Sequence, residues 1–316
     1  MPADPRIKQR LKLRELETLR VVCQAGSMAQ AAKVLSISQP AVSKAISELE
    51  DTLGVPMFDR TAKGVEATIY GRAFVKWANA VFDDIKQGVQ EIEILSDPSS
   101  GELRIGATEP MIAGILPVIL ARLSGQYPRM GFQITQYGAR AQQYRDLRER
   151  RIDLTLGRAL DPASEEFRTE ILFDEPLRVF AGSKNPWFKR RRIGLAELVD
   201  EPWTLPYRDT VVGEMIAEAF HASGLEVPRS GIVCNSVQMH YSLLATSRYL
   251  AMLPESLLRF GHFDLMRVLP IDLNVRVIPV GITVLRNRTI NPIAELFIEC
   301  AREVAKPLAQ RKHKPQ

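Results

Sequence analysis

The chain has 316 residues, 46% of them hydrophobic and 25% charged, which is enough for two or three globular units with cores of their own. Its net charge of +5 permits a polyanionic partner without requiring one, and residues 1–80 hold most of the excess, with twelve Lys and Arg against eight Asp and Glu. The longest apolar stretch, 111–121, is too short to span a membrane, and three distant cysteines exclude a disulfide framework.

The N-terminal segment contains charges but no apolar region of the kind that an export signal needs, so we expect a cytoplasmic protein. A first helix is predicted from residue 13, because apolar residues then recur every three or four positions until Gly26. Ser27 is the expected N-cap of a short second helix, 28–35, and Gln30 stands where a capping box requires it.

The third helix begins after Ser38, tolerates Pro40 in its first turn and ends at Gly54. One face carries the apolar stripe Val42, Ile46, Leu49 and Leu53. The leading part of the opposite face is free of carboxylates and consists of Ser38, Gln39, Pro40, Ser43, Lys44 and Ser47. Since acids follow only from Glu48 onward, this asymmetry suits a helix whose N-terminal half meets phosphates and base edges.

Two short strands, 55–58 and 65–68, are predicted next, and the basic turn between them makes the pair a candidate wing. A long helix then runs from Ile69 to about Leu95. Its apolar seam consists of Phe74, Trp77, Val81, Ile85, Val89 and Ile92. An exposed helix with such a seam needs a partner helix. The segment 97–101 breaks the helix and is a plausible linker.

Beyond the linker, strands alternate with helices, which is typical of an α/β unit. The predicted strands are 103–107, 131–137, 154–157, 177–181, 203–205, 231–234 and 275–285. The predicted helices are 110–125, 142–150, 211–223 and 237–246.

Small molecules bind to such units at the carboxyl ends of the strands. Thr108 and Glu109 follow the first strand and Arg158 follows the third, so Thr108 could hold a ligand oxygen and Arg158 a ligand carboxylate. An ordinary N-cap and a surface arginine are the alternatives. Later strand ends add Tyr207, Asn235 and Ser236 as candidates.

Residues 13–74 resemble the N-terminal domain of the LysR-type transcriptional regulators. The matching positions are Ala31, Ala32, Leu35, Ser38 to Ser43, Ile46, Leu49, Glu50, Leu53, Gly54, Phe58, Arg60, Thr68 and Gly71. The resemblance extends more weakly over the rest of the chain, through the order of strands and helices and the Leu253-Pro254 segment. Where the family often has glycines before that segment, this chain has 246–249 without one.

The resemblance implies a multidomain α/β protein. We expect a winged helix-turn-helix DNA-binding domain at 11–68, a dimerising linker helix at 69–97 and a periplasmic-binding-protein-like effector domain at 101–310. The effector domain would have two lobes, one formed by about 101–171 and 275–310 and the other by about 172–274.

The same resemblance assigns DNA contacts to the leading residues of the third helix, from Ser38 to Ser47. It also assigns Arg60 and Lys63 to the wing, and Thr68 to a phosphate at the start of the linker helix. Double-stranded DNA, a small-molecule effector and RNA polymerase are the implied partners. Sugars, sugar acids and aromatic acids are the effector candidates. The implied assembly is a homodimer or a homotetramer.

A small-molecule-binding protein whose N-terminal helices only mediate protein association is the alternative, and the carboxylate-poor face of the third helix speaks against it. An enzyme fused to a DNA-binding head would need a titratable constellation that the sequence lacks. The four histidines have no metal-ligand spacing, and no phosphate loop or Gly-Xaa-Ser-Xaa-Gly motif occurs. We therefore expect no catalysis, no metal and no cofactor.

Overall fold

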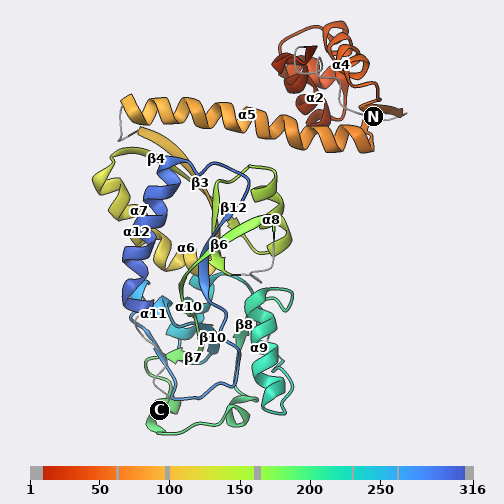
Figure 1. Ribbon diagram of the computed structural model, residues 1–316. Helices are drawn as coiled ribbons and strands as arrows, with labels where there is room; N and C mark the ends of the chain where they lie inside the picture. Colours follow the sequence, from red (N-terminus) through yellow and green to blue (C-terminus); the bar gives the residue numbers. More distant parts are fainter. Residues whose placement is uncertain are drawn as a thin grey trace. The chain divides into compact units, whose positions relative to one another are not determined.

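The computed structural model describes residues 10–61, 64–96, 100–159, 165–229, 231–261 and 263–309. The chain forms two compact units, Met1–Val89 and Gln90–Gln316 (Figure 1). Each unit has its own buried hydrophobic cluster or clusters, as the length of the chain predicts. No described helix is long and apolar enough to cross a membrane.

The first unit begins with three helices, α2 (Leu13–Ala25), α3 (Met28–Val34) and α4 (Gln39–Leu53). Their shared core includes Leu19, Val22, Val42, Ile46 and Leu49, each no more than 3% exposed. Both α2 and α4 end at a glycine in the left-handed conformation. The three predicted helices and their stops are therefore confirmed.

Serine side chains cap the N-termini of α3 and α4. The Ser27 hydroxyl accepts a hydrogen bond from the backbone N–H of Gln30, and the Ser38 hydroxyl accepts one from Ala41. Each bond satisfies a backbone donor that the first turn of a helix leaves without an intrahelical partner. Ser38 therefore fixes where α4 starts and which residues lead it.

The wing consists of β1 (Phe58–Thr61) and β2 (Gly64–Ala67), paired antiparallel. The predicted first strand, 55–58, was placed too early. A carboxylate oxygen of Glu50 on α4 accepts hydrogen bonds from the backbone N–H groups of Met57, at 2.7 Å, and Phe58, at 3.4 Å. Since these donors bind a helix side chain, the chain reaches a strand partner only from Phe58 onward.

The long helix α5 (Ile69–Ser96) follows the wing without interruption, as predicted. Phe74 and Phe82, with the fully buried Ala78 between them, pack against the core of the three-helix unit. The first turn of α5 passes very close to the segment before β1, because a Cβ atom at Gly71 would lie 2.2 Å from the carbonyl oxygen of Met57.

The second unit contains a five-stranded sheet of order β4-β3-β5-β12-β6. Its strands are β3 (Ser100–Thr108), β4 (Arg129–Tyr137), β5 (Leu154–Arg158), β6 (Phe167–Phe173) and β12 (Val280–Leu285). β3 pairs parallel with β4 and β5, whereas β12 runs antiparallel to β5 and β6. The carboxyl ends of β3 and β5 therefore lie at the same edge of the sheet.

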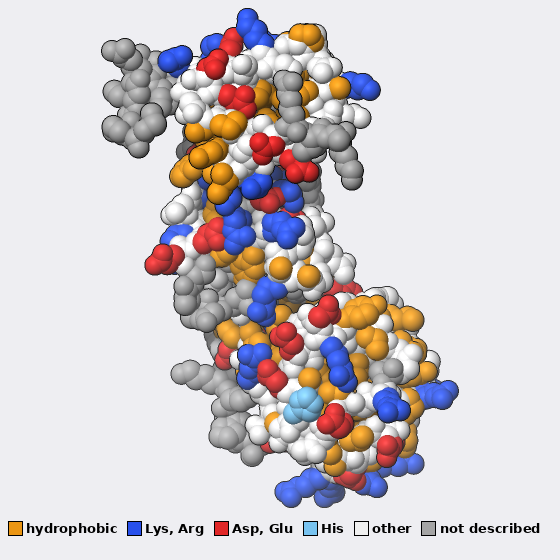
Figure 2. Space-filling model, turned by 90° about the vertical axis from the view of Figure 1, so that its right-hand side faces the viewer, with side chains coloured by type: hydrophobic (Ala, Val, Ile, Leu, Met, Phe, Trp, Pro, Cys, Tyr) orange, Lys and Arg blue, Asp and Glu red, His pale blue; other side chains and the backbone are white. Residues whose placement is uncertain are grey.

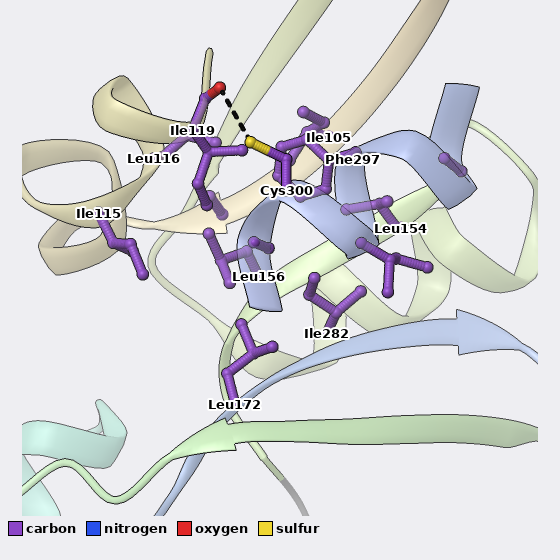
Figure 3. Packing of buried hydrophobic residues seen from close by; sticks show 14 of the residues in the cluster. Ile105, Ile115, Leu116, Ile119, Leu154, Leu156, Leu172, Ile282, Phe297 and Cys300 are labelled. Carbon is purple, nitrogen blue, oxygen red and sulfur yellow. Dashed lines mark hydrogen bonds between the residues drawn. The ribbon is translucent and has the colours of Figure 1, made fainter. Parts of the chain in front are cut away.

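Helices pack on this sheet and complete its core. They are α6 (Glu109–Ala113), α7 (Ile115–Gln126), α8 (Arg140–Arg148) and α12 (Pro292–Ala309). Ile119 of α7 and Phe297 of α12 meet the strand side chains of Ile105 and Leu156, and the Cys300 thiol faces the carbonyl oxygen of Ile119 (Figure 3). Cys300 is thus a core residue.

A second sheet, of order β10-β7-β11, lies beyond the first, and a two-stranded parallel pair, β8 with β9, accompanies it. The strands are β7 (Leu177–Gly182), β8 (Thr204–Leu205), β9 (Ile232–Val233), β10 (Leu250–Pro254) and β11 (Met266–Val268). Its helices and 3-10 turns are η1 (Pro186–Lys189), η2 (Leu195–Leu198), α9 (Val211–Ala222), α10 (Val237–Ala245) and α11 (Leu257–Phe260).

The chain crosses between the two sheets twice, once after β6 and once before β12 (Figure 1). The predicted helix 110–125 is divided at Gly114, whose backbone is not helical, into α6 and α7. The strand predicted from 275 begins only at Val280. The sequence analysis missed the strands β6, β10 and β11, the short helix α11, both 3-10 turns and the closing helix α12.

Ser247 lies in the glycine-free segment 246–249, and it adopts the left-handed conformation, with φ 60°. Its carbonyl oxygen accepts a hydrogen bond from the Asn185 side chain, and its hydroxyl accepts one from the Lys184 backbone N–H. These contacts hold the turn in the conformation that glycine adopts more easily.

Gly71→Ala should destabilise the first unit, because the new methyl group would collide with a backbone carbonyl that is itself held in place. We expect the free energy of unfolding to fall by about 1–3 kcal/mol, measured by urea denaturation of the full chain. Gly88→Ala in the same helix is the control, since open space surrounds that position. It should raise stability by about 0.5–1 kcal/mol. A loss of the same size in both variants would contradict the close approach at Gly71.

Candidate functional sites

The leading edge of α4 is exposed, as the sequence predicts. Ser38, Gln39, Pro40, Ser43, Lys44 and Ser47 are all exposed to solvent. Val42, Ile46 and Leu49 on the opposite face are buried, which fixes the rotation of α4 about its axis. The helix therefore presents hydroxyl, amide and ammonium groups and no carboxylate along its first two turns.

The acids that follow this edge are directed elsewhere. Glu50 binds the backbone N–H groups before β1, as described above. Glu48 accepts a hydrogen bond from Lys12, and its other carboxylate oxygen lies 3.8 Å from the Lys44 ammonium. The Lys44 side chain is 78% exposed, so this ion pair is weak and leaves Lys44 available to a phosphate.

Neither wing residue assigned to DNA can be assessed. Lys63 lies outside the described residues, and so does the side chain of Arg60. Thr68 is described, and its expected phosphate contact is not available. The residue is 8% exposed, its hydroxyl donates to the Pro56 carbonyl oxygen at 2.7 Å, and the same oxygen accepts from the Gly71 backbone N–H at 3.0 Å. Thr68 is the N-cap of α5.

One face of α5 exposes large apolar side chains that the first unit does not cover. They are Ile69, Tyr70, Trp77, Val81, Ile85, Val89 and Ile92, and Trp77 is 71% exposed. Phe74, which the sequence analysis counted in the same seam, packs into the core of the first unit instead. Mixed charges surround exposed apolar groups on the face shown in Figure 2. An apolar stripe of this length is typical of a surface that another molecule covers.

A cavity of about 110 Å³ lies in the second unit, where the carboxyl ends of β3 and β5 face the second sheet. Of the six residues predicted to bind an effector, Thr108, Glu109, Arg158 and Asn235 line it. Parallel pairing of β3 with β5 brings the first three together, as the strand-end argument predicts.

Tyr207 and Ser236 do not line this cavity. The Tyr207 side chain is 51% exposed, and its backbone N–H donates to the Asn235 side-chain oxygen, so this residue positions Asn235. The Ser236 hydroxyl accepts from the Met239 backbone N–H and caps α10. Both residues follow strand ends, but neither is presented to the cavity.

Two backbone carbonyl groups hold the Arg158 side chain at the cavity wall. One guanidinium nitrogen, Nη1, donates to the carbonyl oxygens of Glu175, at 2.9 Å, and Ile278, at 2.8 Å. The other, Nη2, is buried and has no hydrogen-bond partner among the described residues. Burial lowers the pKa of Arg158 to about 10, and the charge of Glu175 opposes this shift. The side chain remains a cation at neutral pH.

A hydrogen bond links Glu109 of α6 to Val237 of α10. One carboxylate oxygen accepts from the backbone N–H of Val237, at 2.9 Å, in the first turn of α10. Burial raises the pKa of Glu109, and the bond from Val237 opposes the shift. The carboxylate therefore occupies the donor end of α10, where a ligand anion would otherwise be favoured.

Two cavity residues were absent from the sequence-based prediction. Gln143 on α8 is 7% exposed and lies one helical turn before the buried Leu147, so a polar residue on the apolar face was the available signal. His240 on α10 is 2% exposed, and its Nδ1 atom lies 2.9 Å from the Thr204 hydroxyl. Burial lowers the pKa of His240 to about 4, so it is neutral near pH 7.

Among the described residues, no group of three or more His, Cys, Asp and Glu side chains could hold a metal ion. The cavity lining combines hydrogen-bonding side chains with the buried cation of Arg158 and the carboxylate of Glu109.

Two family models match the chain. The model described as a bacterial regulatory helix-turn-helix protein of the lysR family covers residues 13–72, and the LysR substrate binding domain covers residues 96–306. Among curated relatives, the HTH-type transcriptional regulator PcaQ of Agrobacterium fabrum is 27% identical over 301 residues, which are 95% of this chain and 96% of PcaQ. GbpR of Azospirillum brasilense is 26% identical over 305 residues, 95% of this chain and 89% of GbpR.

Solved structures share the fold. A full-length OxyR variant from Pseudomonas aeruginosa matches with a TM-score of 0.68 and 22% identity, over 96% of this chain and 99% of that one. Full-length CbnR, a LysR family transcriptional regulator solved in complex with its target DNA, matches with a TM-score of 0.62 and 23% identity, over 93% of this chain and all of CbnR.

Acidification should reveal the neutral His240. The folded pKa of about 4 lies below the ordinary value of 6.5, so the unfolded chain binds the proton first and stability is lost as pH falls from about 6.5 toward 4. Between pH 7 and pH 4.5, we expect this residue to remove about 2 kcal/mol of unfolding free energy. Urea denaturation at both pH values should show that His240→Gln loses less stability than the wild type. An identical pH dependence in both proteins would contradict the burial of a neutral imidazole.

Proposed function

The chain belongs to the LysR family of bacterial helix-turn-helix transcriptional regulators, and from that membership we propose which of its residues contact DNA and which bind the effector. It is a DNA-binding regulator whose C-terminal domain binds a small molecule. The observation that carries the residue assignment is the exposed, carboxylate-free leading edge of α4, which its own buried stripe holds outward. The alternative in which the N-terminal helices only mediate association does not account for the family match of residues 13–72.

In the proposed DNA complex, α4 enters the major groove with its N-terminus leading. Gln39 and Ser43 would contact base edges, because a glutamine amide pairs with adenine and a serine hydroxyl with several bases. Lys44 would contact a phosphate, since it is the one cation of this edge. Arg60 and Lys63 of the wing would reach the backbone or the adjacent minor groove.

Combined replacement of Gln39 and Lys44 by alanine should weaken binding to the DNA upstream of the chain's own gene at least tenfold. One base contact and one phosphate contact are lost, and each base contact is worth about 1–3 kcal/mol. An electrophoretic mobility-shift titration measures this change. Lys44→Ala alone should also reduce the slope of log affinity against log salt by about 1.

Gln126→Ala with Lys189→Ala is the matched control. It removes the same two residue types from exposed positions of the second unit. The control should leave the mobility shift and its salt dependence unchanged. Equal affinity of the α4 variant and the wild type would show that another surface binds the DNA.

We further propose that the DNA-binding domain spans 11–68, the linker helix 69–97 and the effector domain 101–310. The first lobe would comprise 101–171 and 275–310 around the five-stranded sheet, and the second lobe 172–274. The positions of the two sheets support this division, because all strands of β10-β7-β11 and β8-β9 lie between the two crossings.

The exposed apolar face of α5 supports pairing of two linker helices in a homodimer, from which a homotetramer could be built. Trp77→Ser should weaken self-association at least tenfold, since burial of a large aromatic side chain contributes about 2–3 kcal/mol. Sedimentation velocity over a dilution series measures this. Leu258→Ser, at an exposed apolar residue of α11, is the control and should leave association unchanged. Association that survives in Trp77→Ser would place the interface elsewhere.

The remaining parts of the proposal concern partners and setting. The effector would be a sugar, a sugar acid or an aromatic acid, bound in the cavity between the lobes, and RNA polymerase would be a further partner at the promoter. The protein would act in the cytoplasm, where the DNA is, and by binding alone. The cavity supports binding of a small molecule, because hydrogen-bonding side chains and the buried cation of Arg158 line it.

A further inference from the structure

Basic side chains gather at the end of the second unit that η1 and the neighbouring turns form (Figure 1). Five of the nine residues 184–192 are Lys or Arg, and none is acidic. Two further arginines join this segment. The Lys184 backbone N–H donates to the Ser247 hydroxyl, which brings Arg248 close, and the Arg267 guanidinium lies over the Phe188 ring. The basic surface therefore consists of Lys184, Arg248, Arg267 and the four cations of 189–192, all of them exposed.

Most of the charge on the basic surface is not neutralised by the chain itself. Arg190 pairs with Glu197, and both side chains are exposed. The other six cations make no ion pair with an acid among the described residues. Asp264 adds a second acid near Arg267, but a large excess of positive charge remains, and Figure 2 shows Lys and Arg side chains gathered at this end of the unit. A partner that brings negative charge would relieve the mutual repulsion of these cations.

The backbone that carries most of these cations is held in one conformation. Asn185 is 5% exposed, and its side-chain amide donates to the Ser247 carbonyl oxygen at 3.1 Å. Its side-chain oxygen accepts from the Trp187 backbone N–H at 3.0 Å. At the other end of the segment, Ile193 is buried in the core of the second sheet. A segment fixed in this way loses little conformational entropy when it binds, so it suits a specific partner.

Aromatic rings support three of the guanidinium groups. The guanidinium carbon lies 5.0 Å from the ring centre in the pair Arg190–Trp187, 5.6 Å in Arg267–Phe188 and 5.8 Å in Arg248–Tyr249. All three rings are half-buried, so each leaves part of its surface accessible beneath a cation.

The composition of the basic surface favours a protein partner over a nucleic acid. Arginine and aromatic residues are enriched in protein interfaces and lysine is depleted, whereas phosphate contacts use both cations. Five of the seven cations here are arginines. Leu265, whose carbonyl oxygen accepts from the Ser183 N–H, is 49% exposed beside them and offers an apolar contact as well.

We propose that the basic surface binds an acidic segment of a partner protein, one in which Asp and Glu stand among apolar side chains. Carboxylates would pair with the guanidinium groups, whose planar donors match a carboxylate in a bidentate manner. Apolar side chains would cover Leu265 and the accessible parts of the rings. The cations do not line the cavity and do not belong to α4, so the basic surface is separate from both sites of the proposed function.

Fluorescence anisotropy with the full chain and labelled short peptides tests the proposal. The first peptide contains Asp, Glu, Phe, Leu and Ser, the second has Asn and Gln in place of its acids, and the third has Ser in place of Phe and Leu. We expect the first to bind at about 0.15 M salt and to lose affinity as salt rises, because exposed charges are screened. The second should not bind, and the third should bind more weakly than the first.

Variants of the basic surface locate the binding. Arg191→Ala with Arg192→Ala should weaken binding of the first peptide about fivefold, since two exposed ion pairs are lost. Both side chains are exposed, so the fold should be retained. Glutamate at the same two positions should abolish this binding and permit binding of a peptide with Lys in place of its acids. Arg145→Ala with Arg168→Ala is the matched control, because it removes two exposed arginines from α8 and β6, and it should leave binding unchanged.

The inference is overturned if the first peptide does not bind the wild type, or if the second binds equally well. Full affinity in the Arg191 and Arg192 double alanine variant, or an equal loss in the control, would also overturn it. If that double variant instead loses affinity for a DNA duplex of random sequence, the basic surface contacts DNA and not a protein. The mobility shift of the α4 variants tests the proposed function separately.

Discussion

The parallel pairing of β3 with β5 is the constraint on which the proposed effector site depends. Parallel strands that lie side by side end at the same edge of a sheet. Thr108 and Arg158 therefore lie close together, although they are 50 positions apart in the sequence. The crossover between these strands supplies α8 and places Gln143 beside both. The second sheet and its helices then close the space, and they add Thr210, Asn235 and His240 to the lining.

The proposed DNA-binding surface depends on a different constraint, the burial of one stripe of α4. Val42, Ile46 and Leu49 can be buried only if the face opposite them points away from the core. The glycine at the end of α4 and the serine at its start fix the length of the helix, so the exposed face has a defined beginning. The exposure of this face is determined by the spacing of residues within the helix, so it could be predicted from the sequence alone.

Features that depend on residues close together in the sequence could be predicted, whereas features that depend on contacts with distant residues could not. Helix α4 and its caps could be predicted because every signal lies within the helix. Thr68 could not be placed, since its role depends on the Pro56 carbonyl oxygen, which no local pattern identifies. Tyr207 and Ser236 follow strand ends, but neither is presented to the cavity. The Tyr207 backbone N–H positions Asn235, and the Ser236 hydroxyl caps α10. Gln143 and the helix α12 could have been found from the helical spacing of the apolar residues around them. The three residues of β11 are too few to show the alternation of a strand.

The hydrogen bond from Val237 to Glu109 has a consequence for how the two lobes respond to an effector. Opening the cleft would expose an amide and a carboxylate that now satisfy each other, at a cost of about 1–3 kcal/mol. The unliganded domain would then spend most of its time closed, with the entrance available only in a minor population. Effector affinity would accordingly be reduced by the rarity of that open state, and the hydrogen bond from Val237 to Glu109 would set the concentration at which the regulator responds.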